Sequence, residues 1–190
     1  MNCFDFDQTI FKGNSMRRFF FFCLLRLPYL LLYLPVQIIA ALLYAVRILN
    51  KDAFLRVAEG FVLFVPCKRR FVQSFWKHNF RRIKEWYLQI RASDDVVISA
   101  SPQWLVQPAC DLLEVTCIAT DASPKTYLCG THCYGAQKIA YFQRTFPQTR
   151  PKAFYSDSLS DEPMLRLAEK GYLVSGEQVT LAFEGGRRLA

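Results

Sequence analysis

A run of 20 residues without a charged side chain, 27–46, constrains this chain more than any other feature of its sequence. The run is long enough for an apolar helix to span the hydrocarbon core of a bilayer. Apolar residues also fill 19–25, and Pro28 and Pro35 divide the whole stretch into helices too short to cross one by one. We therefore expect residues 19–46 to form either a helical hairpin that dips into one leaflet or the apolar core of a soluble domain.

The segment around this run is basic. Residues 12–91 hold 15 Lys and Arg but 3 Asp and Glu, whereas the rest of the 190-residue chain is mildly acidic. A basic surface attracts phosphate from lipid headgroups, nucleic acid or a phosphorylated substrate. Nucleic acid is not expected as a partner. Aromatic side chains could stack on bases, but nucleic-acid binding would not explain the uncharged run 27–46. Oligomeric state is left open by the sequence.

Basic residues flank both ends of the apolar stretch 19–46. Arg17 and Arg18 precede it, and Arg47 and Lys51 follow it. In a membrane protein this pattern places both ends on the cytoplasmic side. The expected location is therefore the cytoplasmic face of an inner membrane, with a soluble cytoplasmic protein as the alternative.

The seven cysteines are expected to be reduced. Two Asp among the first 11 residues argue against a secretory signal peptide, which favours a cytoplasmic setting. Cys129 and Cys133 stand in the sequence Cys-Gly-Thr-His-Cys, but no second ligand pair follows at the spacing of a zinc site. We expect small thiols packed in a hairpin over residues 125–134, with Gly130 near the turn.

Apolar strands alternate with amphipathic helices outside the basic segment. Strands are expected at 2–6, 96–100, 115–119 and 152–156, and helices at 105–113, 135–146 and 162–170, where Gly171 would stop the last one. This alternation predicts an α/β fold with a parallel sheet. Residues 13–91 would be a helical insertion, with a basic amphipathic helix over 68–91.

Four polar clusters follow these strands or begin a helix. They are Asp5-Phe-Asp7-Gln-Thr9, Ser99-Ala100-Ser101-Pro102, Lys138, and Asp157-Ser158-Leu-Ser-Asp161. Parallel sheets bind ligands at the carboxyl ends of their strands, so these clusters are expected to meet in one site. Taken singly, the last two clusters have simpler interpretations: Lys138 as a solvated helix residue, and Asp157 and Asp161 as turn and cap residues.

Together, in this order, the clusters resemble the motifs of the haloacid dehalogenase-like phosphatase superfamily, subfamily IB. Those motifs are D-x-D-x-T, a Ser or Thr that ends a strand, a lone Lys, and an acidic pair. The resemblance implies a Rossmann-like core of residues 1–12 and 92–190, with a cap of residues 13–91 that closes over the active site. Gln8 stands where the superfamily often has Gly.

The resemblance implies a phosphoric monoester hydrolase that works through an aspartyl-phosphate. Asp5 would be the nucleophile, and Asp7 would protonate the leaving alkoxide and later deprotonate the attacking water. Asp5, Asp157 and the main-chain carbonyl of Asp7 would bind Mg²⁺, which removes the repulsion between carboxylate and phosphate. Thr9, Ser158 and Asp161 would support these groups.

The same resemblance assigns the phosphate-binding residues. Ser99 would donate to the phosphoryl oxygens, together with the backbone amides of Ala100 and Ser101 at a helix N-terminus. Lys138 would neutralise the charge that develops in the transition state.

Two groups of relatives suggest different substrates. Phosphoserine phosphatases carry an acidic residue seven positions after the second Asp of the first motif, where this chain has Asn14. The bacterial phosphatidylglycerophosphatase C family has an apolar, proline-containing run after that motif and a Ser-Pro-Gln stretch like residues 101–103. We therefore expect a membrane phospholipid phosphate such as phosphatidylglycerophosphate as the substrate. A soluble metabolite such as phosphoserine is the alternative, and a lipid-binding scaffold without activity is disfavoured by the intact motifs.

Overall fold

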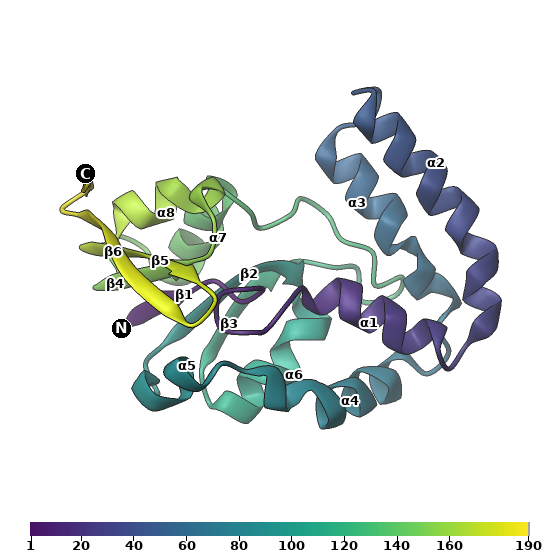
Figure 1. The fold of residues 1–190 in the computed structure, drawn as a ribbon, viewed down its shortest axis with the longest axis horizontal. Helices are drawn as coiled ribbons and strands as arrows, with labels where there is room; N and C mark the ends of the chain where they lie inside the picture. The colour runs from purple at the N-terminus through teal and green to yellow at the C-terminus, as the bar shows by residue number, and fades with distance from the viewer. Residues whose placement is uncertain (190) are drawn as a thin grey trace.

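The computed structural model describes residues 1–189, and the centre of this part is a seven-stranded sheet (Figure 1). The strand order is β3-β2-β1-β4-β5-β6-β7, in which β3 to β5 are parallel neighbours and β6 and β7 are antiparallel. The strands are Asn2–Phe4 (β1), Val96–Pro102 (β2), Thr116–Thr120 (β3), Ala153–Ser156 (β4), Lys170–Ser175 (β5), Gln178–Glu184 (β6) and Arg187–Arg188 (β7). The prediction of an α/β fold with a parallel sheet is confirmed.

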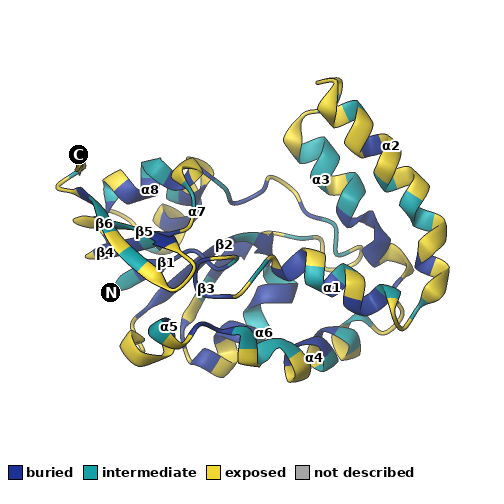
Figure 2. Cartoon of the chain, in the orientation of Figure 1, coloured by how far each residue is buried: buried dark blue, intermediate teal, exposed yellow. Residues whose placement is uncertain are grey.

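Side chains alternate between the two faces of the sheet, as the pleat of a strand requires. Phe4 and Val97 belong to one buried cluster, whereas Cys3, Val96 and Ile98 belong to another. Helices cover both faces (Figures 1 and 2). On the first lie Lys68–Asn79 (α4), Glu85–Ile90 (α5) and Gln103–Leu113 (α6), and on the second lie Gln137–Thr145 (α7) and Glu162–Leu167 (α8).

The order of the strands reverses at β1. The chain passes from β1 to β2 and β3 on one side, and returns through β4 and β5 on the other. A parallel sheet leaves a crevice at the carboxyl ends of its strands where the order reverses. Asp5, which directly follows the last residue of β1, lies at this position.

The first half of the insertion begins with a helix that packs on the body, and the helices after it project from the body. Ser15–Leu24 (α1) leads into the 3₁₀ segment Pro28–Tyr33, then Leu34–Ala45 (α2) and Lys51–Glu59 (α3). We call residues 28–59 the helical arm; in it α2 and α3 lie side by side (Figure 1). Pro28 and Pro35 occupy the first turns of their helices, where a missing N–H leaves no gap in the hydrogen bonding. In α2, Ala40 alone is buried (Figure 2).

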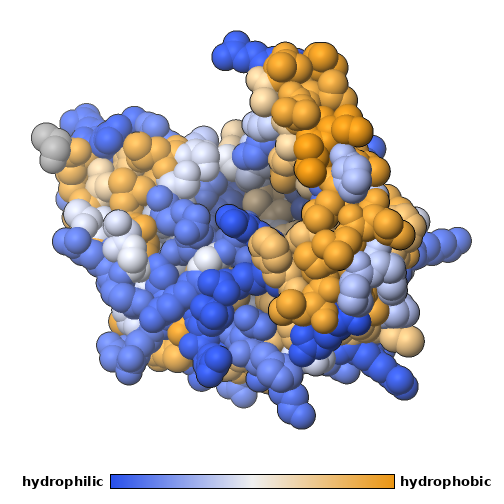
Figure 3. All heavy atoms as spheres, turned by 45° about the vertical axis from the view of Figure 1, so that its right-hand side comes forward, coloured by the Kyte–Doolittle hydropathy of each residue, from blue (hydrophilic) through white to orange (hydrophobic). Residues whose placement is uncertain are grey.

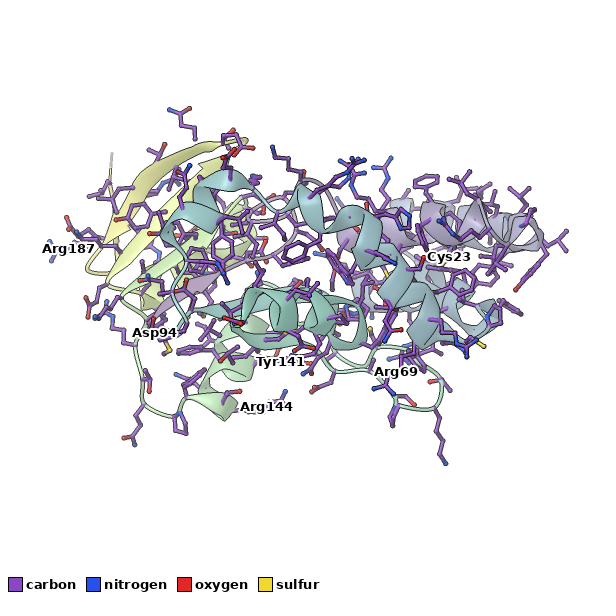
Figure 4. The ribbon with its side chains drawn as sticks, turned by 90° about the horizontal axis from the view of Figure 1, so that it is seen from below. Cys23, Arg69, Asp94, Tyr141, Arg144 and Arg187 are labelled. Carbon is purple, nitrogen blue, oxygen red and sulfur yellow. The ribbon has the colours of Figure 1, made fainter. Side chains whose placement is uncertain are left out.

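The second half of the insertion returns to the sheet. Trp76 on α4 donates from Nε1 to the carbonyl of Leu105 on α6, 2.6 Å away, and the Tyr87 ring on α5 lies 4.8 Å from that of Phe4. Seen from below, α4, α5 and α6 form one layer (Figure 4). The predicted boundaries at 13 and 91 stay a prediction, but the structure shows that residues between them complete the core as well as the arm.

Two predictions within the insertion are wrong in detail. Residues 19–46 do not fold back on themselves, because α2 packs along α3 instead of α1. The single helix expected over 68–91 is interrupted at 80–84. There the backbone leaves the helix to bond the loop after β1: Lys12 N donates to Arg82 O and Lys84 N to Ile10 O, both at 2.8 Å.

The hairpin expected over 125–134 is also wrong. In the described chain this segment is a loop with one isolated bridge, between Ala122 and Cys129. Tyr127 has a left-handed φ of 64°, which a β-strand does not adopt, and its carbonyl accepts a hydrogen bond from Trp104 Nε1 at 3.0 Å. The backbone pairs residues 121–123 with residues 128–130 instead, since Ser123 N donates to Leu128 O at 2.9 Å and Gly130 N to Asp121 O at 3.1 Å.

The last predicted helix is too long. It ends at Leu167, and Gly171 lies inside β5, where a side-chain Cβ would come within 2.7 Å of the Leu165 carbonyl oxygen. Gly171 therefore permits close packing of α8 on the sheet. Strands β5 to β7 were not predicted, although Gly176 and the pair Gly185-Gly186 mark the two turns between them.

Candidate active site

Lys138 holds two carboxylates together at the carboxyl ends of β1 and β4. Its Nζ donates to Asp5 Oδ1 and to Asp161 Oδ2, the latter at 2.6 Å. All three side chains are buried. Asp161 is fixed further by Ser156 Oγ at 2.9 Å and by the backbone N–H of Gly135 at 3.2 Å. The lysine is thus a structural part of the site and not a solvated helix residue.

Burial and the opposite charge of the partner have opposing effects on the pKa values of Asp5 and Lys138. Burial raises the pKa of Asp5 from 3.8 to about 7, although Lys138 acts to lower it. For Lys138, burial acts to lower the pKa, but Asp5 and Asp161 outweigh it and the pKa is raised. Lys138 therefore stays charged and can stabilise negative charge on an anion beside Asp5.

Asp7 is held by a different set of donors. Its Oδ1 accepts from the backbone N–H of Ser15 at 2.6 Å, and its Oδ2 accepts from Ser101 Oγ at 2.5 Å and Ser15 Oγ at 3.2 Å. Burial raises the pKa of Asp7 against the effect of these hydrogen bonds. A raised pKa favours the protonated form of the carboxyl group, which is the form that a general acid needs.

Ser15 is a site residue that the sequence analysis missed. It is the first residue of α1 and follows the cap residue Asn14, whose Oδ1 accepts from Arg17 N at 2.8 Å. Its own N–H is free for Asp7, because the first N–H groups of a helix have no partner within the helix. The Asn-Ser pair before an apolar helix was the available signal.

Thr9 connects the loop after β1 to the loop after β4. Its Oγ1 lies 3.2 Å from Asp5 Oδ2 and 3.4 Å from Asp157 Oδ1, and it accepts a bond from Asp157 N at 2.9 Å. The carboxylates of Asp5 and Asp157 therefore converge on one point. Ser158, the next residue, accepts from Ser160 N with its own hydroxyl and shapes this loop.

The converging groups fit Mg²⁺. Asp5 and Asp157 are hard oxygen donors, and burial raises the pKa of both carboxyl groups, so a bound divalent cation would relieve the cost of keeping them ionised. The Asp7 carboxylate points instead to Ser15 and Ser101. Asp7 could thus join the metal only through its main-chain carbonyl, as the sequence motif implies.

Gln8 and Lys84 fix the loop that carries Asp7. Gln8 adopts a left-handed φ of 62°, a conformation that Gly adopts without strain and that explains the usual Gly of the motif. The buried Lys84 on the insertion donates from Nζ to the Gln8 carbonyl at 2.6 Å. Lys84 therefore links the loop to the returning part of the insertion, which the sequence did not indicate.

The second motif differs from expectation. Ala100 and Ser101 line the site, whereas Ser99 is buried behind them and its Oγ accepts from Ser101 N at 3.1 Å. Ala100 and Ser101 also belong to β2, since α6 begins at Gln103. The expectation of their amides at a helix N-terminus is therefore wrong, and Ser101 contacts Asp7 through its hydroxyl. The phosphate-binding roles of Ser99, Ala100, Ser101 and Lys138 stay predictions.

A cavity of about 750 Å³ joins these residues to the insertion. One end is lined by Asp5, Asp7, Lys138 and Asp157. The other end is lined mainly by apolar side chains of α1, α3 and the segment after α3: Met16, Phe20, Phe21, Phe54, Leu55, Ala58 and Phe61. Polar side chains also reach it, among them Arg17 on α1, Gln37 on α2 and Lys51 on α3. The arrangement can hold an anion at one end and an apolar group at the other.

Comparisons with known proteins agree with this geometry. A family model described as haloacid dehalogenase-like hydrolase matches residues 3–166. A Bordetella pertussis Tohama I protein of unknown function aligns with a TM-score of 0.72 and 16% identity, over 90% of this chain and 87% of that chain. A search of curated proteins found no match.

Two further solved structures are similar. A phosphoserine phosphohydrolase-like protein from Francisella tularensis subsp. tularensis SCHU S4 has a TM-score of 0.55 and 15% identity, over 90% of this chain and 86% of its own. A HAD family hydrolase from Salmonella enterica serovar Typhi has a TM-score of 0.54 and 11% identity, over 87% of this chain and 59% of that chain. The prediction of a hydrolase of this superfamily is confirmed, while subfamily IB and the phosphatidylglycerophosphatase resemblance stay predictions.

The raised pKa of Asp5 predicts how Mg²⁺ stabilises the protein at different pH values. In the absence of metal, the folded state favours the protonated form of Asp5. This contribution to the free energy of unfolding is complete below the ordinary pKa of 3.8 and is lost as the pH rises through the raised pKa of about 7. Protons compete with Mg²⁺ for this carboxylate. Saturation to 100 times the dissociation constant adds about 2.7 kcal/mol to the free energy of unfolding. The added stability at a fixed Mg²⁺ concentration should be larger at pH 8 than at pH 5.5.

Thermal unfolding with and without Mg²⁺ measures this effect. Asp157→Asn should reduce the shift in Tm, whereas Asp111→Asn, on the exposed end of α6, should keep it. An equal shift at both pH values, or none, would contradict the assignment of Asp5 to the metal.

Proposed function

The chain belongs to the haloacid dehalogenase-like hydrolase family, and we propose that it is a Mg²⁺-dependent phosphatase that removes the phosphate of a membrane phospholipid through an aspartyl-phosphate. Phosphatidylglycerophosphate is the substrate that the sequence resemblance favours. The observation that carries the proposal is the cavity, which runs from the buried carboxylates to an apolar wall on the insertion.

The side chains of the site support a two-step reaction. Asp5 would attack phosphorus while Asp7 gives a proton to the departing alkoxide, so that the P–O bond to the alcohol breaks as the bond to Asp5 forms. Water would then attack the same phosphorus, with Asp7 taking its proton, and inorganic phosphate would leave with Asp5 restored. Ser15 and Ser101 hold Asp7 for both transfers.

Charge is the main obstacle to this reaction, because a phosphate monoester and Asp5 are both negative. The ammonium of Lys138 contacts Asp5 directly and is itself fixed by Asp161. Its charge thus lies beside the reacting atoms without the need for reorganisation. Mg²⁺, when bound, supplies further neutralisation and orients the phosphate.

The helical arm supports a lipid substrate. Leu31, Ile38 and Leu42 are 52%, 58% and 62% exposed, so the arm is not the closed apolar core of a soluble cap. The apolar surface of the arm is continuous in Figure 3. Residues Pro28–Ala45 form an 18-residue helical stretch with a mean hydropathy of 1.7, of which 11% is buried.

The geometry of the arm favours an interfacial position over a crossing. α3 runs back along α2 and carries Lys51, Asp52 and Arg56, which are poorly suited to the hydrocarbon core. We propose that α2 lies in the headgroup region of the cytoplasmic leaflet with its apolar side chains buried. Arg26 and Arg47, exposed near the two ends of the stretch, would contact anionic headgroups.

Hydrolysis of a soluble phosphate is the second candidate. The similarity to a phosphoserine phosphohydrolase-like protein favours it. Asn14 weakens it, because the side chain that replaces the expected acid is engaged in capping α1. The relative rates on lipid and soluble phosphates decide between the two.

Replacing the nucleophile tests the chemistry. Asp5→Asn should lower phosphate release by more than about 100-fold, because an amide is a far weaker nucleophile and metal ligand than a carboxylate. Phosphate release in the presence of Mg²⁺ measures the effect. Asp111→Asn is the matched control on the surface, and circular dichroism checks the fold. Residual Asp5→Asn activity above that level would contradict the covalent role.

Replacing apolar side chains of the helical arm tests its proposed contact with the membrane. The combined variant Leu31→Ser, Leu34→Ser, Ile38→Ser and Leu42→Ser should bind anionic vesicles more than about tenfold less tightly, since each such side chain contributes about 1.5–3 kcal/mol when fully buried. Its activity on a vesicle-borne phospholipid phosphate should fall, and its activity on a small soluble phosphate should change less. Vesicle flotation and paired assays measure both.

A matched control removes exposed apolar groups elsewhere. Leu88→Ser, Ile90→Ser and Leu112→Ser together alter α5 and α6, far from the arm, and should leave vesicle binding unchanged. High salt should weaken wild-type binding without abolishing it, because the apolar contribution is not screened. If the wild-type protein is monodisperse without detergent and does not bind vesicles, the soluble phosphatase becomes the leading candidate.

A further inference from the structure

A second group of metal-type ligands lies where the helical arm meets the body. Glu59, the last residue of α3, faces Cys129 and His132 from the loop between β3 and α7. Their ligand atoms all lie within 4.8 Å of one another, and the three residues are 7%, 4% and 1% exposed. We call these three residues the Cys-His-Glu cluster.

Two polar atoms of this cluster have no hydrogen-bond partner within residues 1–189. They are Glu59 Oε2 and His132 Nε2, and both are buried. A buried polar atom without a partner costs about 1–3 kcal/mol, so such atoms call for an explanation. His132 Nε2 lies 3.5 Å from Glu59 Oε1, too far for a good hydrogen bond. That separation is close to the roughly 3.4 Å between two ligands of a tetrahedral zinc ion with bonds of about 2.1 Å.

Asp52 provides the support that a metal-binding histidine normally has. Its Oδ1 lies 3.2 Å from His132 Nδ1, and Asp52 precedes Glu59 by about two helical turns on the same helix. A carboxylate on Nδ1 fixes the imidazole with Nε2 as the free ligand atom. The ring of His132 is therefore already oriented toward Glu59 and Cys129.

We propose that Glu59, Cys129 and His132 bind a zinc ion that links the helical arm to the catalytic body. One thiolate, one imidazole and one carboxylate suit zinc and are poor ligands for Mg²⁺. Glu59 and His132 also line the cavity, so the fourth ligand would be water or a group bound there. The site is separate from the all-oxygen site at Asp5 and Asp157, and it would fix the position of α3 over the cavity.

Metal binding and cobalt spectroscopy test this proposal without relying on activity. Untagged, metal-free protein is mixed with equimolar Zn²⁺, dialysed and analysed for metal, and a second sample is titrated with Co²⁺. Wild-type protein should retain one zinc per chain and show a sulfur-to-cobalt charge-transfer band, which the oxygen ligands of the Mg²⁺ site cannot produce. Zinc should also raise the Tm of the wild-type protein.

Matched variants assign the ligands. Cys129→Ser should lose the charge-transfer band, whereas Cys67→Ser, which removes an exposed thiol, should keep it. Asp52→Asn should keep the band but weaken zinc binding about 10–100-fold. If Cys129→Ser does not fold, Glu59→Gln, nearly isosteric with the wild-type side chain, provides the test and should weaken zinc binding. No retained zinc and no band in the wild-type protein, or a band that survives Cys129→Ser, would overturn the proposal.

Discussion

The ion pair of Lys138 with Asp5 and Asp161 is the interaction on which the rest of the site depends. A buried ammonium is stable only when its charge is paired, and removing one partner of such a group typically costs 3–5 kcal/mol. The three residues come from α7, from the end of β1 and from the turn before α8. Their pairing thus fixes the carboxyl ends of two strands and the start of a helix relative to one another. The same pairing gives Asp5 a cation beside it, which a carboxylate nucleophile needs if it is to approach a phosphate.

The insertion has two roles, and the packing of its halves separates them. Residues 68–90 return to the sheet, where Trp76 bonds the backbone of α6 and Lys84 fixes the loop that carries Asp7. The helical arm instead leaves most of α2 exposed and forms one wall of the cavity. An apolar helix that the fold does not cover is costly in water, so its exposure needs an environment that covers it. The proposed membrane position provides one, next to the cavity that would receive the lipid phosphate.

The site could be predicted from sequence to the extent that it follows from topology. Asp5, Asp157 and Asp161 meet because strand ends in a parallel sheet converge, and Lys138 joins them from the first turn of α7. Contacts made by residues outside the motifs could not be predicted: Ser15 reaches Asp7 from the insertion, and Glu59 meets Cys129 and His132 across 70 residues of chain. The break at 80–84 was missed for the same reason, since its cause is hydrogen bonding to residues 10–12 and not a local signal. Local sequence patterns thus predict helices and strands, whereas hydrogen bonds between residues distant in the chain determine where these elements end.

Trapping the phosphorylated enzyme tests whether Asp5, fixed by Lys138, forms a covalent aspartyl-phosphate. Enzyme mixed with Mg²⁺ and substrate can be quenched rapidly, reduced with borohydride, which converts an aspartyl-phosphate to homoserine, and analysed by peptide mass spectrometry. We expect homoserine at position 5, and only when substrate is present. Turnover without modification of Asp5, or modification of another carboxylate in its place, would contradict it.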